Sequence, residues 1–465
     1  MKLVEAGSKI LFSRVGQVLA NAAVVMIVAH ILGPEGQGHY SLTVALVMLL
    51  ASLLGGGMGL AAVPPLRQEK IRPQRMLAAQ LGWTAAMVLV LIGLAATSTG
   101  GRLAGLLGRH LGWSDGVGYL AALAAVGILG FETFSYDLLA RGRLVVGAAV
   151  NGVRATGHLG LVAALALGGA LTFERTVGAF AVAQFCGMAM VLIIVVREFR
   201  RAPAVLPAPA AAPPLPLKPD AEEVPDDLDR RSVPALIAYN LRRGWLGQIS
   251  AVAYFLLLRL DQGLLEHYRG AAEVGIYSVA VYMGEMLWLL PGALTPLLVH
   301  SSAAHASDPE RDRTAARAVR LGILVTLAVG VPLLFLVEPL VGLLAGGEYR
   351  ASAEAFQALL PGIVVFAPGA VLAGDFIGRG KPHWNTQASA LTVLVNIVVG
   401  VQLIPRYGAV GAAWASTIAY ACGTFVMLAR FRRATRMSLR GMILGQHRRM
   451  IAPPDAGGAE RGVEP

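Results

Sequence analysis

Charged residues are scarce in this chain of 465 residues: Asp, Glu, Lys and Arg make up 14% of it, against 56% hydrophobic residues. Soluble domains carry about 25% charged residues, so this deficit excludes an ordinary soluble protein. The ~10-residue alternating segments of a membrane β-barrel are also missing. Only two cysteines occur, Cys186 and Cys422, and both fall in apolar runs, so we expect no disulfide framework, metal site or cofactor.

Long apolar runs dominate the rest of the sequence. Runs of about 18 to 25 residues are long enough to cross a ~30 Å hydrocarbon core as helices. The sequence therefore predicts an all-α polytopic membrane protein with about twelve transmembrane helices. The predicted spans lie near residues 15–32, 40–63, 76–98, 117–139, 147–168, 176–196, 244–265, 275–299, 319–337, 352–376, 384–404 and 408–429.

The basic residues predict the orientation of these spans. With the amino terminus inside, thirty Lys and Arg residues fall in cytoplasmic segments and six fall outside. Both termini are therefore expected in the cytoplasm. The net charge of +11 follows from this bias together with attraction to anionic membrane lipids, and nothing further supports nucleic-acid binding.

The spans divide into two halves. Residues 198–233 are Pro/Ala-rich and then acidic, so they predict a disordered cytoplasmic linker. The expected organisation is an N-terminal six-helix lobe at 1–197, the linker, a C-terminal six-helix lobe at 234–430, and a basic flexible cytoplasmic tail at 431–465.

A turn motif is written twice, 237 residues apart. "LGPEGQGHYS" (32–41) and "RGAAEVGIYS" (269–278) each connect the first two spans of a half. The offset pairs Gly33 with Gly270, Gly38 with Gly275 and Tyr40 with Tyr277, and these six residues form the repeat turn motif. Glycines permit a tight turn, and the tyrosines are expected at the outer membrane interface.

A second echo supports duplication: "TVGAFAVA" (176–183) resembles "AVGAAWAS" (409–416). Because six is an even number, duplicated six-helix lobes keep the same orientation. They would be related by a pseudo-twofold axis along the membrane normal, with a cavity between them, as in transporters.

Three stretches carry a resemblance to a known family. "AHILGPEGQGHYSLTVAL", "LRLDQGLLEHYRGAAEVGIYSVAVYMGEMLWLLPGAL" and "GRGKPHWNTQASALTVLVNIVVGVQLIPRYGAVGAAWAST" resemble the Wzx-type polysaccharide flippases of the multidrug/oligosaccharidyl-lipid/polysaccharide exporter superfamily. The resemblance implies alternating access and transfer of a polyprenyl-diphosphate-linked oligosaccharide across a bacterial inner membrane. It implies membrane lipids and the lipid-linked glycan as partners, a monomer, and no enzyme; contacts with a polymerase or other synthesis proteins stay open.

Arginines near the cytoplasmic side are candidates for diphosphate binding. Arg14, in "LFSRVGQ", could hold a diphosphate by a forked contact, or could simply snorkel to the interface. "FSRV" is similar to lipid II flippases, but those carry an Arg-Asp pair where this chain has Ala20 and Asn21, which argues against lipid II. Arg243 beside span seven fixes topology or captures phosphate.

The sharpest candidates lie in "LLLRLDQGLL", within the membrane, where ionisable groups are costly. Arg259 is a substrate-contact candidate, and Asp261 and Glu285 are ion-coupling or gating candidates; structural pairing within the lobe is the alternative. At i and i+2 on a helix the two do not face each other, so each needs its own partner. Counted from the outer ends of their spans at ~1.5 Å per residue, Arg259 lies roughly 9 Å and Glu285 roughly 15 Å inward, and Glu285 is the expected neighbour of Arg259. The resemblance implies a retained Arg-x-Asp here.

Other intramembrane charges have plainer interpretations. Glu132 and Arg154 fall at similar depth on spans four and five and predict a structural ion pair, with substrate contact by Arg154 as the alternative. Asp375 is a gating candidate or an interfacial residue. His158 could titrate near neutral pH, or could be a packing residue.

Two other functions compete with the flippase. A multidrug exporter of the same superfamily fits the spans, although arginines in the cavity would disfavour cationic drugs. A membrane polymerase or ligase would need a sizeable outer loop with acids, Arg and His. The longest outer segment, 99–116, has one acid, Asp115.

Overall fold

The computed structural model describes residues 2–96, 111–201, 224–288, 291, 292, 298, 309–438, 441 and 442, and these contain helices and no strand. The long helices are α1 (Lys2–Gly55), α2 (Met58–Arg67), α3 (Pro73–Ala96), α5 (Asp115–Ala140), α6 (Leu144–Leu167), α7 (Phe173–Arg201), α8 (Val233–Arg269), α9 (Ala271–Leu287), α11 (Pro309–Leu344), α12 (Arg350–Gly378) and α13 (His383–Thr435). Two short 3-10 helices, η1 (Leu228–Arg230) and η2 (Gly347–Tyr349), precede α8 and α12.

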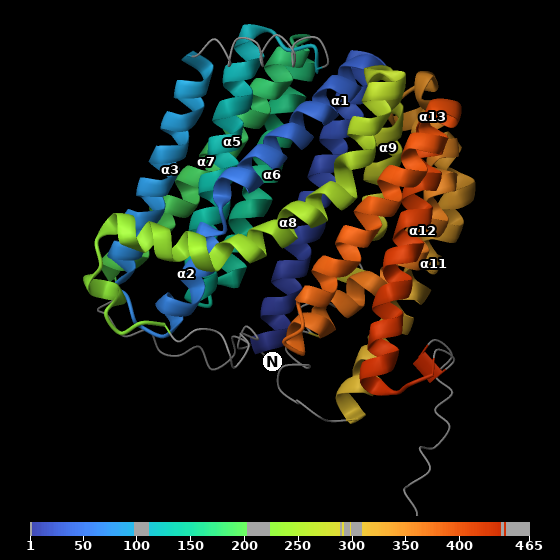
Figure 1. Cartoon of the computed structure of the whole chain (residues 1–465). Helices are drawn as coiled ribbons and strands as arrows, with labels where there is room; N and C mark the ends of the chain where they lie inside the picture. The colour runs from blue at the N-terminus through green and yellow to red at the C-terminus, as the bar shows by residue number, and fades with distance from the viewer. Residues whose placement is uncertain are drawn as a thin grey trace, which may run out of the picture.

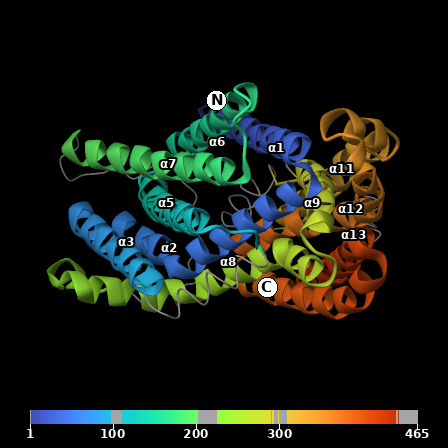
Figure 2. The ribbon, with the colours of Figure 1, turned by 90° about the horizontal axis from the view of Figure 1, so that it is seen from above.

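The helices form two lobes, as predicted. Viewed from above, α3, α5, α6 and α7 gather on one side and α11, α12 and α13 on the other, with α1 and α9 between them, while α8 runs along one edge from beside α3 to the second group (Figure 2). Eight of the described helices are long and apolar enough to cross a membrane. Among these, α1 and α13 each contain a non-helical glycine, Gly33 and Gly408. The all-helical membrane fold is confirmed, while the count of twelve spans stays a prediction.

The repeated turns adopt nearly the same backbone conformation. Gly33 has φ 68° and ψ −178°, and Gly270 has φ 85° and ψ 175°. This positive φ favours glycine because a Cβ would be strained there. Pro34 then occupies the first helical position, where its missing N–H removes no helical bond.

The two tyrosines of the motif lie inside the bundle and not on its surface, so the expected interfacial role stays a prediction without support from their burial. The chain is helical directly after each glycine, so Tyr40 and Tyr277 lie seven residues, or roughly 10 Å, further along their helices. Both side chains are buried, at 3% and 0% exposure. The glycines and the proline of residues 32–38 are typical of a loop, and this pattern conceals the early start of the helix.

The bundle has two ends, which we name by their contents. The turn end holds the glycine turns at 33, 270 and 408; the linker end holds the start of α1 and of α8, where the amino terminus is marked (Figure 1).

At the turn end the two lobes touch through backbone. A Cβ on Gly38 would lie 2.6 Å from the carbonyl carbon of Ala271, and one on Gly275 would lie 2.7 Å from that of Pro34. These two contacts interchange under the 237-residue offset, as a pseudo-twofold axis requires. We call this contact between α1 and α9 the seam.

Hydrogen bonds between the lobes flank the seam. The amide of Gln37 donates to Ser278 Oγ at 3.1 Å, and Ser41 Oγ donates to the Gln262 carbonyl at 3.2 Å. Tyr349, from η2, donates to the carbonyl of Ala29 at 3.2 Å. The turn end is therefore closed.

At the linker end, residues 224–244 pack on the first lobe; we call them the docking segment. Val224 and Leu228 are buried in a core with α2 and α3. The backbone N–H and the guanidinium of Arg72 each donate to the Asp229 carboxylate at 2.9 Å, and Lys70 pairs with Asp226. Burial would raise the pKa of Asp229, but these contacts with Arg72 outweigh it and the pKa is lowered.

These contacts correct the linker prediction. Residues 202–223 lie outside the described part of the chain, but residues 224–233, expected to be disordered, are folded against α2 and α3. The average composition of this acidic stretch predicts disorder, but it conceals two apolar residues, Val224 and Leu228, that anchor the segment in the core. Further along, Gly57 and Gly244 let α2 and α8 cross in backbone contact.

Candidate functional site

A cavity lies between the lobes in two adjoining chambers. The outer chamber, about 710 Å³, reaches the linker end at Ile10 and Arg143. The inner chamber, about 410 Å³, extends toward the seam as far as Tyr40 and His158. Both are lined by Gln17, Met48, Phe131, Glu132 and Asn151, so they form one continuous passage.

Two arginines line the outer chamber. Arg14 on α1 is exposed there, as the sequence predicted for a residue at the mouth of the first span. Arg143, just before α6, lies in the same chamber and pairs with Glu198 at 3.4 Å. Guanidinium groups suit this position because their forked donors match phosphate oxygens.

Arg154 in the inner chamber is held by amides. Its guanidinium donates to Asn151 Oδ1 at 2.6 Å and 3.1 Å and also to Gln184 Oε1, and it lies 4.9 Å over the ring of Phe131. Asn151 in turn donates to Gln17 at 2.8 Å. The cluster presents a cation and polar amides to the passage.

Among the described residues, Glu132 and Arg154 make no direct salt bridge, although each charge acts on the other across the passage. In the described part of the chain Arg154 contacts the two amides, while Glu132 is exposed to both chambers. Equal depth in the membrane does not say which way two side chains point around their helix axes. The guanidinium of Arg154 instead donates its hydrogen bonds to the nearby amides of Asn151 and Gln184.

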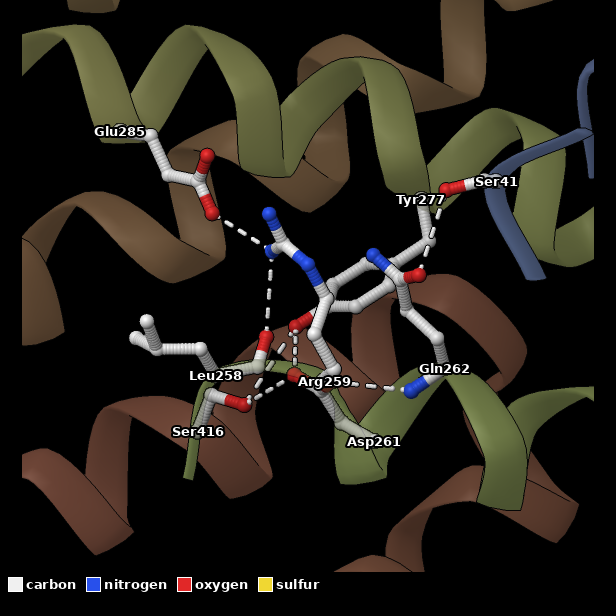
Figure 3. A network of polar contacts seen from close by, with 8 residues as sticks. All are labelled: Ser41, Leu258, Arg259, Asp261, Gln262, Tyr277, Glu285 and Ser416. Carbon is white, nitrogen blue, oxygen red and sulfur yellow. Dashed lines mark hydrogen bonds and ion pairs between the residues drawn. The ribbon is translucent and has the colours of Figure 1, made fainter. Parts of the chain in front are cut away.

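Arg259 finds the neighbour that the sequence predicted. Its guanidinium lies 2.5 Å from the carboxylate of Glu285, and both side chains line the inner chamber at 15% and 23% exposure. The guanidinium also lies 5.5 Å from the ring centre of Tyr282. Figure 3 shows this pair beside the buried network of α8.

Asp261 points the other way, as its i, i+2 spacing from Arg259 requires. Its carboxylate accepts hydrogen bonds from the Tyr277 hydroxyl at 2.5 Å and the Ser416 hydroxyl at 2.8 Å (Figure 3). Asn396 donates to Ser416 at 3.0 Å. Asp261 is 2% exposed and joins α8, α9 and both halves of α13, outside the residues that line the two chambers.

Two further candidates lie away from the passage. Arg243 on α8 stacks over Tyr239 at 5.4 Å. Asp375 is buried in the second lobe and pairs with Arg379 at 2.5 Å, and Arg379 also contacts Asp312 at 2.7 Å. Neither is among the residues that line the chambers.

Sequence reasoning missed several lining residues. It treats Arg143 only as a topogenic charge, and the amides Gln17, Asn151 and Gln184 draw no attention because they carry no charge. Polar amides inside otherwise apolar runs are the sequence signal that could have identified these lining residues.

His158, a candidate from the sequence, lines the inner chamber. Its ring lies 3.5 Å from the Tyr40 hydroxyl and edge-on to Phe180.

A two-lobed helical membrane bundle, with a polar passage between the lobes that is closed at one end, defines a transporter of the flippase and exporter type. The chain belongs to the polysaccharide biosynthesis protein family, whose model matches residues 6–298. This family falls within the superfamily that the sequence motifs resemble.

One similar curated protein is the capsular polysaccharide biosynthesis protein CapF of Staphylococcus aureus. It is 25% identical over 158 residues, which cover 33% of this chain and 40% of that protein. The match thus spans less than half of the relative's length.

Solved structures share the fold at low identity. The lipid II flippase MurJ in an inward closed conformation superposes with a TM-score of 0.70 at 12% identity, covering 95% of this chain and 89% of that one. The MATE multidrug transporter DinF-BH gives 0.65 at 14% identity, covering 95% and 96%. An inward-facing multidrug resistance transporter of the same superfamily gives 0.63 at 16% identity, covering 90% and 94%.

Proposed function

We propose that this chain is a flippase that moves a polyprenyl-diphosphate-linked oligosaccharide from the cytoplasmic to the outer leaflet by alternating access. The observation that carries the proposal is a passage lined by arginines and amides that reaches the linker end while the seam closes the turn end. The family and the capsular polysaccharide relative support a glycan carrier as substrate.

The chambers suggest how such a substrate would sit. Arg14 and Arg143 would bind the diphosphate near the mouth, where the polyprenyl tail can stay in lipid. The sugars would extend inward to Asn151, Gln17 and the Arg154 guanidinium, whose donors and acceptors match hydroxyl groups. The Arg259–Glu285 pair would then lie at the inner limit of the glycan.

The orientation and organisation follow from the same proposal. The linker end would face the cytoplasm of the bacterial inner membrane, in agreement with thirty basic residues on that side and six on the other. Two lobes, 1–197 and 234–430, would rock against each other in a monomer, so that the seam opens and closes. The docking segment, including residues 234–244 at the start of the second lobe, would move with the first lobe. Polysaccharide synthesis proteins remain candidate partners.

The test is to delete the gene and locate the accumulated lipid-linked oligosaccharide with membrane-impermeant glycan-modifying reagents on oriented vesicles. Accumulation on the cytoplasmic face is expected, relieved by wild type and by Arg406→Ala, an exposed arginine at the turn end. Arg14→Ala and Arg259→Ala are expected to relieve it at least tenfold less at equal protein level.

Other outcomes would overturn parts of the proposal. Relief by both arginine variants would remove these residues from the site while keeping the flippase. Accumulation on the outer face would indicate a polymerase or ligase. Absence of accumulation, with loss of drug resistance instead, would indicate the multidrug exporter that shares this fold.

A further inference from the structure

A second polar site lies outside the passage, among α3, α5 and α8. Asp137 on α5 is 1% exposed and Gln80 on α3 is fully buried. The Gln80 amide donates from Nε2 to Asp137 Oδ1 at 3.1 Å. In the described part of the chain, the other two oxygens of this contact, Asp137 Oδ2 and Gln80 Oε1, have no hydrogen-bond partner.

One proton satisfies both oxygens. A carboxylic acid and a primary amide form a cyclic pair with two bonds, N–H to one carboxyl oxygen and O–H from the other to the amide oxygen. The first bond is present, and the two unpaired oxygens are those that the second bond would join. An ionised carboxylate here would instead bury a charge and leave two acceptors unsatisfied, which is costly.

No ion pair within the described residues neutralises Asp137. Arg141, at the end of the same helix, is the cation whose charge acts on it. The charged or titratable groups near this level on α5 and on the helices packed around it are Arg67 on α2, Arg75 on α3, Glu132, Tyr136 and Arg141 on α5, Arg143 before α6, Glu198 on α7, and Tyr239, Arg242 and Arg243 on α8.

The pair is continuous with the docking segment. One helical turn before Gln80, Met76 accepts a hydrogen bond at its sulfur from the Asn240 amide of α8, at 3.2 Å. Asn240 is fully buried and its Oδ1 lacks a partner within the described residues. Met76 also packs in the core that holds Leu236 and Tyr239 of α8.

We propose that Asp137 is a proton-binding site: its carboxylic acid pairs with the carboxamide of Gln80, and loss of the proton to water weakens the packing of α8 on the first lobe. A carboxylate at Asp137 would lack the second bond to Gln80 and would draw water between α3 and α5. Met76 is one helical turn from Gln80 and bonds to Asn240 of α8, so this water would also disturb the contact between α3 and α8. The site does not depend on what the passage carries, because neither Asp137 nor Gln80 lines it.

Infrared spectroscopy of the purified full chain tests the proton directly. We expect a carboxylic-acid C=O band at neutral pH that shifts on ¹³C-aspartate labelling, disappears in Asp137→Asn, and persists in Asp375→Asn. Asp375 is the matched control because it is equally buried but paired with Arg379. Absence of a label-sensitive band, or its survival in Asp137→Asn, would overturn the site; the label works without any substitution, should the variant fail to fold.

Labelling of a buried cysteine tests the coupling to α8. Leu236→Cys, in a chain with Cys186 and Cys422 replaced, would be labelled by a maleimide in wild-type and Asp137→Asn backgrounds. At each pH the labelling rate in the wild-type background is divided by the rate in the Asp137→Asn background, so that the ionisation of the thiol itself cancels. We expect this ratio to stay near one at pH values where the carboxylic-acid band is present, and to rise at least threefold as the band disappears with rising pH. A ratio that stays at one would refute the coupling. The purified protein needs no substrate, so failure of the flippase proposal would not affect either measurement.

Discussion

Replacing Gly38 by alanine should force the seam open at the turn end. The new Cβ would lie 2.6 Å from the carbonyl carbon of Ala271, whereas carbon atoms pack at about 3.5 Å or more. The carbonyl oxygen of Ala271 would lie closer still, so α1 and α9 must separate by at least about 1 Å. The obstacle is backbone, so no side chain can rotate away. Gly275→Ala meets the Pro34 carbonyl in the same way and should have the same effect.

The free energy that this separation costs can be worked out from the hydrogen bonds on either side of the seam. The bonds from Gln37 and Ser41 and the one from Tyr349 are already 3.1 to 3.2 Å long, so an added 1 Å would break them. At about 1 kcal/mol each, their loss removes roughly 3 kcal/mol from the closed state, which shifts its population about 150-fold. Opening of the turn end should then become readily detectable.

The assay is cysteine accessibility from the turn side. Val44 lines the inner chamber, so Val44→Cys, in a chain without Cys186 and Cys422, should react with an impermeant maleimide only when the seam opens. Gly38→Ala should raise the labelling rate at least tenfold. Gly263→Ala is the matched control, because its Cβ would meet no atom within 4 Å. Unchanged labelling in a folded Gly38→Ala protein would refute the seam as the closure.

Three further predictions concern single contacts. Arg259→Ala should lower the free energy of unfolding by roughly 3 kcal/mol, because Glu285 loses its partner; the double alanine variant should be more stable than the single one in thermal unfolding, and the reverse order would contradict an ion pair. Tyr277→Phe should cost about 1 to 3 kcal/mol, because a buried carboxylate loses a hydroxyl donor; an unchanged melting temperature would argue against that bond. Because the folded chain lowers the pKa of Asp229, its contacts stabilise the docking segment fully above about pH 4, and this stabilisation is lost as pH falls through the lowered pKa. Hydrogen exchange at residues 224–231 should therefore rise in acid, and Asp229→Asn should reduce this pH dependence to the part that Asp227 carries, since hydrogen bonding to Arg231 lowers the pKa of Asp227 as well.

The sequence predicted the features that depend on pattern along one helix. The lengths of the apolar runs predicted the membrane-spanning helices, and the repetition of the turn motif at Gly33 and Gly270 predicted two lobes. Depth along spans seven and eight gave Arg259 its partner. Each of these needs only the helical rise and the chemistry of the residues concerned.

Features that depend on rotation about helix axes were not predictable. Glu132 and Arg154 share a depth, but the guanidinium of Arg154 bonds to Asn151 and Gln184 instead. The i, i+2 spacing separates Asp261 from Arg259, but it does not say that Tyr277 and Ser416 would be the partners of Asp261. The contact of Gly38 with Ala271 depends on how α1 and α9 are aligned along each other, and the sequences of the two helices do not give this alignment. The pairing of Asp137 with Gln80 joins two helices whose mutual rotation follows from packing alone.

The seam also bears on the electrical integrity of the membrane. A passage whose two chambers measure about 710 and 410 Å³ would conduct ions and dissipate an ion gradient if its closed end opened even briefly while the other end was open. Long side chains exchange rotamers within nanoseconds and would seal such a passage imperfectly. Two backbones in direct contact at Gly38 and Gly275 have no rotamers to exchange. For the flippase proposed above, this closure would let the passage take up a large solute from one side while the membrane stays insulated against ions.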